Sequence, residues 1–63
     1  MKEIKRFSLN STEKSAQVVF LNGHKKMVQV NQVSRPDTVY GEPMTILWVK
    51  ADKGEEELVC YAQ

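Results

Sequence analysis

The sequence has very few of the side chains that build disulfides or metal centres. Cys60 is the only cysteine and His24 the only histidine among 63 residues. One cysteine excludes a disulfide within the chain, and a structural zinc ion ordinarily takes four cysteine or histidine ligands. We therefore expect no metal and no cofactor. A domain this short must instead be stabilised by a well-packed core, by self-association or by a bound partner.

Long apolar runs are also missing. No stretch of 18 apolar residues occurs, and the first ten residues, MKEIKRFSLN, are rich in charge. A membrane-spanning helix needs about 20 predominantly apolar residues, and a secretion signal needs an apolar centre of about 7–15. Together with an unpaired cysteine, these absences predict a cytoplasmic protein without a membrane partner.

Catalytic motifs are absent as well. The sequence contains no GxGxxG, GxxxxGK[ST], HExxH or CxxC pattern. A nucleophile–base pair would have to bring Cys60 to His24, and the strands predicted below place these two residues on different hairpins. The run Glu55-Glu56-Glu57 is interpreted as a solvated strand end that discourages edge-to-edge aggregation. We therefore predict that the chain is not an enzyme.

What the sequence does contain is a series of short apolar runs, rich in β-branched and aromatic residues and separated by turn residues. This pattern favours strands over helices. We predict one all-β domain over residues 1–63. Its expected form is a small five-stranded, mostly antiparallel barrel or a strongly bent sheet, built from two hairpins plus an N-terminal strand.

The first predicted hairpin turns near Asn22-Gly23. A two-residue turn would set Val28 opposite Gln17 and mix apolar with polar side chains. A three-residue loop that ends in a left-handed Gly23 pairs even positions with even positions and keeps the apolar side chains on one face. We predict the three-residue loop. The shared face then holds Ala16, Val18, Phe20, Val28 and Val30.

The second predicted hairpin turns at Asp52-Lys53-Gly54, which also suits a three-residue loop with a left-handed glycine. That loop pairs Trp48 with Leu58, and both faces of the hairpin are then mostly apolar. Such a hairpin lies centrally, closes a barrel or has one face covered by a partner. From the two hairpins, the predicted core comprises Val18, Phe20, Val28, Val30, Ile46, Trp48, Leu58 and Cys60.

A fifth strand is predicted from Ile4 to Leu9. Ile4 is out of phase with Phe7 and Leu9, so we expect a bulge or an early bend in this strand. The strand is also one of two ways to cover the odd-numbered apolar face of the second hairpin. The other is a second copy of the chain, bound through a two-fold pairing of like hairpins.

Charged residues are segregated, although the net charge is only +1. Residues 1–35 hold seven basic against two acidic residues, a net +5, and residues 36–63 hold two basic against six acidic residues, a net −4. Such asymmetry can mark an electrostatic binding surface. Alternatively, the two halves interleave in the fold and the charges mix.

A small chain without catalytic equipment is expected to act by binding. We predict a non-catalytic protein-interaction or structural module, a small accessory protein whose partner is another protein or itself, as a homodimer. Arginine and aromatic residues are favoured interface anchors, and the long irregular stretch 32–43 is of the kind that often carries function. The predicted partner-binding residues are Arg35, Val39, Tyr40, Leu47, Val49, Val59 and Tyr61.

The alternative function is single-stranded nucleic-acid binding by a small β-barrel that uses its basic N-terminal half. Such barrels combine a basic groove with exposed aromatic side chains. The near-neutral net charge counts against this alternative, because nucleic-acid-binding domains are usually strongly basic. The residues predicted to contact nucleic acid are Lys5, Arg6, Lys25, Lys26 and Arg35.

Overall fold

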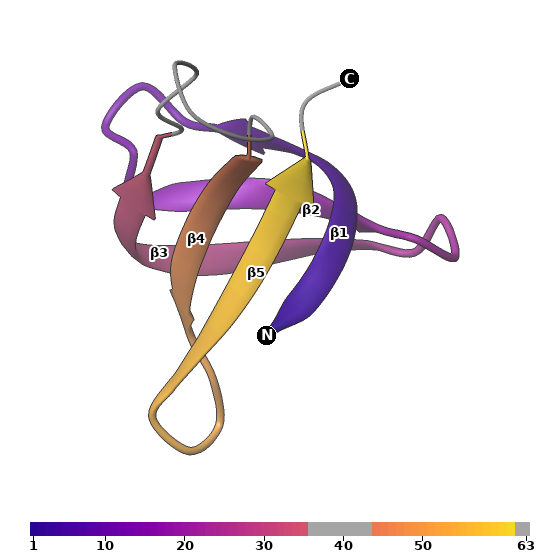
Figure 1. Ribbon diagram of the computed structural model, residues 1–63. Coiled ribbons are helices and arrows are strands. Elements are labelled where there is room, and N and C mark those ends of the chain that lie inside the picture. Colours follow the sequence, from indigo (N-terminus) through magenta and orange to yellow (C-terminus); the bar gives the residue numbers. More distant parts are fainter. Residues whose placement is uncertain (36–43, 62–63) are drawn as a thin grey trace.

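Five strands form a closed ring in the computed structural model, which describes residues 1–35 and 44–61 (Figure 1). Each strand pairs antiparallel with the next, and β1 and β5 close the ring in parallel, because the first and last strands of a five-stranded meander run in the same direction. The predicted five-stranded all-β fold is confirmed. The strands are β1 (Lys2–Leu9), β2 (Ser15–Phe20), β3 (Lys25–Ser34), β4 (Met44–Lys50) and β5 (Glu55–Tyr61).

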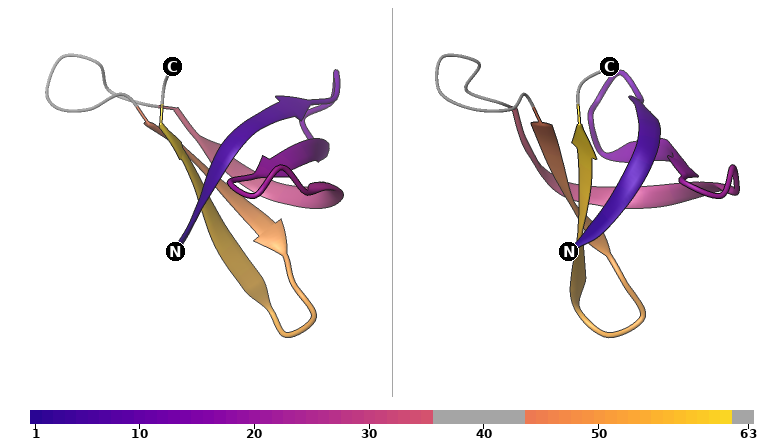
Figure 2. Two further views of the ribbon diagram at one scale, coloured as in Figure 1. Left: turned by 90° about the vertical axis from the view of Figure 1, so that its right-hand side faces the viewer. Right: turned by 45° about the vertical axis from the view of Figure 1, so that its right-hand side comes forward.

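Two bent strands allow so small a ring to close. The start of β1 pairs with β5 and the remainder with β2, and the register shifts between Ile4 and Arg6. In β3 the N-terminal half pairs with β2 and the C-terminal half with β4, and the register shifts between Val30 and Gln32. A bulge bends a strand and increases its twist. Each of these two strands therefore pairs with one neighbour along its first part and with the other neighbour along the rest (Figure 2). The bulge expected early in β1 is confirmed.

The loop between β2 and β3 is the predicted three-residue loop. The Phe20 N–H donates to the His24 carbonyl at 2.8 Å, and the Gly23 N–H donates to the Phe20 carbonyl at 2.9 Å. Gly23 has φ +87°, the left-handed conformation that a residue without a Cβ adopts at little cost. Even positions therefore pair with even positions, as in Ala16 with Val28.

The loop between β4 and β5 differs from the prediction. Lys50 pairs with Glu55, and the Ala51 N–H donates to the Gly54 carbonyl at 3.0 Å, so the loop has four residues. Trp48 consequently lies opposite Glu57 rather than Leu58. The error has a physical reason: both faces of this hairpin are apolar, so side-chain alternation alone does not select the register.

The one-residue change reverses the two sides of β4. Leu47 (0% exposed) and Val49 point into the barrel, whereas Ile46 and Trp48 are only partly buried and lie on its outer side. The prediction that Ile46 and Trp48 belong to the core is therefore wrong. An indole ring is large for the interior of a five-stranded barrel, and its N–H needs a polar partner that an aliphatic core lacks.

The core is aliphatic and draws on all five strands. Phe20 and Val28, predicted as core, are partly buried and pack against its edge, together with Phe7 and Leu9. Leu47 and Val49 are thus buried within the single chain, and of the two alternatives the second copy is not needed to cover these two residues. The core cluster consists of Ile4, Ala16, Val18, Val30, Leu47, Val49, Leu58 and Cys60.

A pair of truncations on adjacent residues tests this register. We expect Leu47→Ala to lower the free energy of unfolding by roughly 2–5 kcal/mol, because the removed atoms leave a cavity in the core. Ile46→Ala should cost clearly less, since its side chain is partly exposed. Urea denaturation of both variants measures the difference, and an equal or larger loss for Ile46→Ala would contradict the four-residue loop.

Candidate functional site

The outer side of β4 and β5 carries a contiguous set of apolar side chains. Ile46 pairs with Val59 and Met44 pairs with Tyr61, and in a strand alternate residues share a face. Trp48 follows on the same side of β4. We call this surface the outer β4–β5 face, and it consists of Met44, Ile46, Trp48, Val59 and Tyr61.

Exposure varies across this face. Tyr61 is 39% exposed, and Ile46 and Trp48 are partly exposed further along the same face. Val59 is only 3% exposed, so its side chain is inaccessible, which corrects its assignment as a partner-binding residue. Ile46 and Trp48 were missed as surface residues by sequence reasoning. The signal that could have found them is the indole N–H, which requires an acceptor such as the facing Glu57.

Glu57 holds the indole in place. The Trp48 Nε1–H donates to Glu57 Oε1 at 3.1 Å, and the two residues are cross-strand partners. This bond satisfies the only polar atom of the ring and fixes the indole over the outer side of β5. The hydrogen bond therefore favours the orientation of the indole that lies over Glu57.

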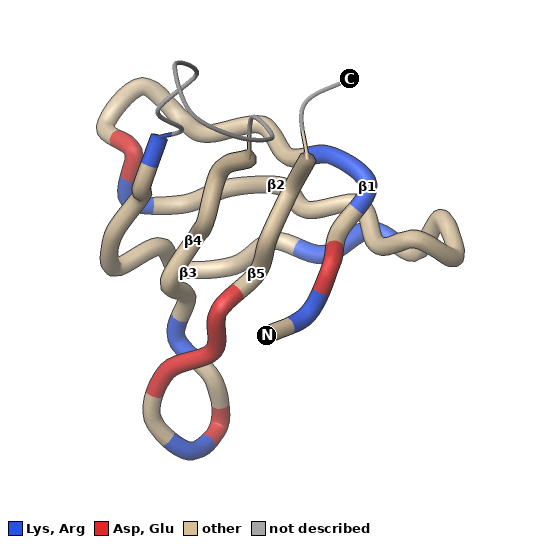
Figure 3. The backbone as a smooth tube through the Cα atoms, viewed as in Figure 1, with Lys and Arg blue, Asp and Glu red and all other residues tan. Residues whose placement is uncertain are grey.

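Acidic residues border the outer β4–β5 face. Glu57 lies on it, and Glu3 of β1 pairs with Val59 at its edge. Further acidic residues gather at the end of the β4–β5 hairpin, with Lys50 and Lys53 among them (Figure 3). The charges of the C-terminal half therefore form one acidic end in the described part of the chain rather than mixing evenly.

The structure brings only some of the predicted nucleic-acid residues together. Arg6 and Lys25 flank Val19 in one cross-strand row on the outer side of β1, β2 and β3. Lys5 lies at the β1 bulge beside Arg6, and Lys26 takes the other side of β3, where it pairs with Val18 on the core side of β2. No continuous basic groove is formed by these four residues.

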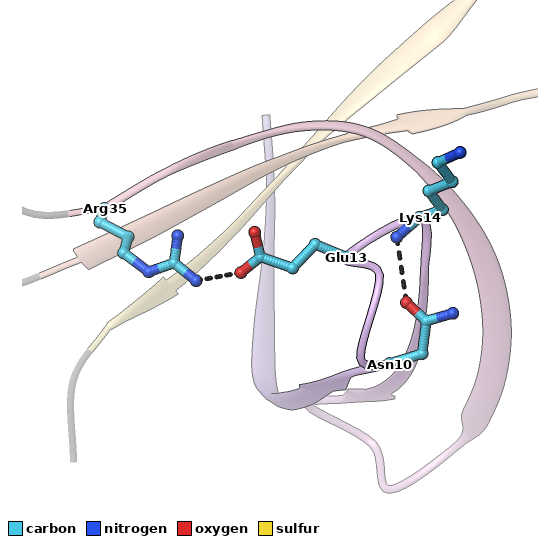
Figure 4. A network of polar contacts seen from close by, with 4 residues as sticks. All are labelled: Asn10, Glu13, Lys14 and Arg35. Carbon is cyan, nitrogen blue, oxygen red and sulfur yellow. Dashed lines mark hydrogen bonds and ion pairs between the residues drawn. The ribbon is translucent and has the colours of Figure 1, made fainter.

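Arg35 lies apart from that group, beyond the end of β3. Its guanidinium forms an ion pair with Glu13, in the loop between β1 and β2 (Figure 4). Asn10 organises this loop, since its Oδ1 accepts the N–H of Lys14 at 3.0 Å. Both partners of the ion pair are largely exposed, and such pairs contribute only ~0–1 kcal/mol, so Arg35 remains accessible to a partner.

The other predicted partner-binding residues have different positions. Leu47 and Val49 are core residues and are inaccessible, which corrects their assignment as contact residues. Tyr61 lies on the outer β4–β5 face. Val39 and Tyr40 lie outside the described residues.

Cys60 and His24, the two residues considered for a nucleophile–base pair, lie in different parts of the fold. The Cys60 thiol lies inside the barrel and donates to the Lys5 carbonyl at 3.6 Å. Burial, and secondarily the negative charge of Glu3, raise the pKa of Cys60, whereas a catalytic thiol requires a lowered pKa. His24 is exposed in the β2–β3 turn, where its ring stacks on Phe20 at a centroid distance of 6.3 Å.

Comparison of the chain with protein-family models, with curated proteins and with solved structures finds no match. Within residues 1–35 and 44–61, no three His, Cys, Asp or Glu side chains are grouped so that they could hold a metal ion. The same residues form no helix that is long and apolar enough to cross a membrane.

The environment of Cys60 predicts slow thiol chemistry. At pH 8 the folded protein should react with iodoacetamide much more slowly than the urea-denatured protein, because a raised pKa and burial reduce the accessible thiolate. The folded-state rate should rise as the pH increases toward the raised pKa. Mass spectrometry of the alkylated chain measures both rates, with Cys60→Ser as the unlabelled control. Equal rates for folded and denatured protein would contradict the buried position of the thiol.

Proposed function

We propose that the chain is a non-catalytic protein-interaction module that binds another protein through the outer β4–β5 face. The observation that supports this most directly is an apolar surface, bearing Trp48 and Tyr61, on the outside of a barrel whose core is already closed. Aromatic side chains are favoured interface anchors. An apolar cluster left on the outside of a small domain commonly marks an interaction site.

The acidic border favours a different protein over a second copy. A two-fold pairing sets the same surface against itself, so it would bring the carboxylates of Glu3 and Glu57 from both copies into one interface. Juxtaposed like charges weaken association. A partner that combines apolar side chains with lysine or arginine complements this surface better.

Photo-crosslinking tests the proposed function. Tyr61 is replaced by p-benzoylphenylalanine, which keeps an aromatic ring at this exposed position, and the protein is irradiated in lysate of its source cells. We expect a discrete protein adduct that is lost when Ile46→Lys is added, because a buried ammonium disrupts an apolar contact.

Two controls accompany the crosslinking. The same photoreactive residue at Leu21, which is 60% exposed in the β2–β3 turn, should give no such adduct. Gln17→Lys adds the same charge on an exposed position of β2 and should leave the Tyr61 adduct intact. Thermal unfolding confirms that each variant is folded. An adduct that survives Ile46→Lys, or that forms equally from Leu21, would refute the assigned surface.

Nucleic-acid binding is the second candidate, favoured by the row of Arg6 and Lys25 across the outer side of β1–β3. That side carries no aromatic residue among the described positions, because Phe7 and Phe20 pack toward the core. Base stacking therefore has no platform there.

Titration with a mixed-sequence single-stranded oligonucleotide separates the two candidates. We expect no binding at moderate salt, and no difference between the parent and an Arg6→Glu, Lys25→Glu double variant. Binding that weakens steeply with salt and is abolished by the double variant would instead establish the nucleic-acid function. Fluorescence anisotropy of a labelled oligonucleotide measures both.

A further inference from the structure

The N-terminal half of β3 has a strand neighbour on one side only. Residues 25–29 pair with β2, whereas β4 pairs with β3 only from Val30 onward. The β2–β3 and β4–β5 hairpins point in different directions beyond this corner, and no described strand covers the second side of residues 25–29 (Figure 2). The barrel is closed, but this segment remains a free edge.

Two hydrogen bonds decide which backbone groups face that edge. The Phe20 N–H donates to the His24 carbonyl, and the Val30 N–H donates to the Lys14 carbonyl at 2.9 Å. Hydrogen-bonded and non-hydrogen-bonded pairs alternate along an antiparallel ladder, so the even residues of β3 bond to β2. The N–H and carbonyl groups that point away from β2 belong to Lys25, Met27 and Gln29.

A cleft of about 520 Å³ lies beside this edge, between the two hairpins. Phe20 and Val28 line it from one hairpin, and Val49 and Leu58 line it from the other. Lys26, Lys50 and Lys53 stand around it, with Asp52 and Glu56 as the acidic members. The lining of the cleft thus combines apolar side chains with three basic and two acidic ones, a slight excess of positive charge.

We propose that an extended segment of another protein binds as an added strand along the free edge of β3, from Lys25 to Gln29. Strand addition supplies main-chain hydrogen bonds, and pockets for alternate side chains supply specificity. Alternate side chains of the added strand enter the cleft over Phe20 and Val28, which favours apolar residues there. The intervening side chains lie beside Lys25 on the outer side, which favours acidic residues.

The edge lysines make this pairing selective. Charged residues on an edge strand discourage pairing between copies, because Lys25 and Lys26 of both chains would meet along one seam. The same lysines attract an acidic segment. The inference rests on the proposed function, because it too takes the partner to be a protein. The edge of β3 and the outer β4–β5 face are nevertheless separate surfaces, and different substitutions test them.

The probe is the blocked peptide acetyl-Val-Glu-Val-Glu-Val-amide, titrated into the ¹⁵N-labelled full chain. We expect saturable chemical-shift changes and slowed hydrogen exchange at the amides of Lys25, Met27 and Gln29. The amides of Lys26 and Val28 already bond to β2 and should change little. A peptide with lysine in place of glutamate is the charge control and should bind more weakly.

Met27→Pro is the decisive variant. Proline removes an N–H that faces the free edge and no hydrogen bond to β2, a position where edge strands tolerate it. We expect affinity for the peptide to fall about tenfold, the loss of roughly one hydrogen bond. Met27→Val keeps the N–H and should bind like the parent. Thermal unfolding shows whether each variant is folded.

Alternately N-methylated peptides keep the test valid if Met27→Pro does not fold. Methylation of one alternate set of peptide nitrogens should abolish binding, and methylation of the other set should leave it intact. Ile46→Lys, which disrupts the outer β4–β5 face, should leave peptide binding unchanged. Any of three results would overturn strand addition at β3. These are the absence of saturable binding, chemical-shift changes confined to Ile46 and Trp48, and full binding of the peptide by Met27→Pro. None of these outcomes decides the crosslinking result at Tyr61.

Discussion

Closure of a five-stranded ring by two bent strands is the constraint on which the rest of this structure depends. Five short strands enclose little volume, so the interior accepts aliphatic side chains and excludes the indole of Trp48. The bulges after Ile4 and Val30 let β1 and β3 turn from one neighbour to the next. Without these bends the sheet would stay open, and Leu47 and Val49 would lose the closed interior in which they are buried.

The same bends create both candidate binding surfaces. Because β3 leaves β2 for β4 partway along its length, residues 25–29 keep one unpaired side. Because the interior takes Leu47 and Val49, the alternate residues of β4 lie outside, on the same face as Tyr61 of β5. An apolar face and a free edge therefore both follow from the way a small barrel is built.

The two proposed surfaces differ in the charged residues that lie beside them. Among the described residues, the acidic residues of the second half gather at the β4–β5 hairpin (Figure 3), with Glu57 on the outer β4–β5 face. Lys25 and Lys26 belong to the part of β3 that has the free edge. The two proposed surfaces thus carry charges of opposite sign. Arg35 does not join either group, since its contact is with Glu13 in the β1–β2 loop.

The sequence by itself determined the number and order of the strands, the β2–β3 loop and the bulge in β1, whereas β3 runs on to Ser34, into the stretch 32–43 that was expected to be irregular. Each rests on a local pattern: β-branched runs between turn residues, Gly23 with alternating apolar positions on both sides, and Ile4 out of phase with Phe7. Only the tertiary structure decided the sides of β4. Both sides of the β4–β5 hairpin are apolar, so alternation was satisfied by either register, and the size of the barrel interior made the choice. That choice moved Leu47 and Val49 into the core and placed Ile46 and Trp48 on the surface, because a one-residue shift in a strand reverses every side chain.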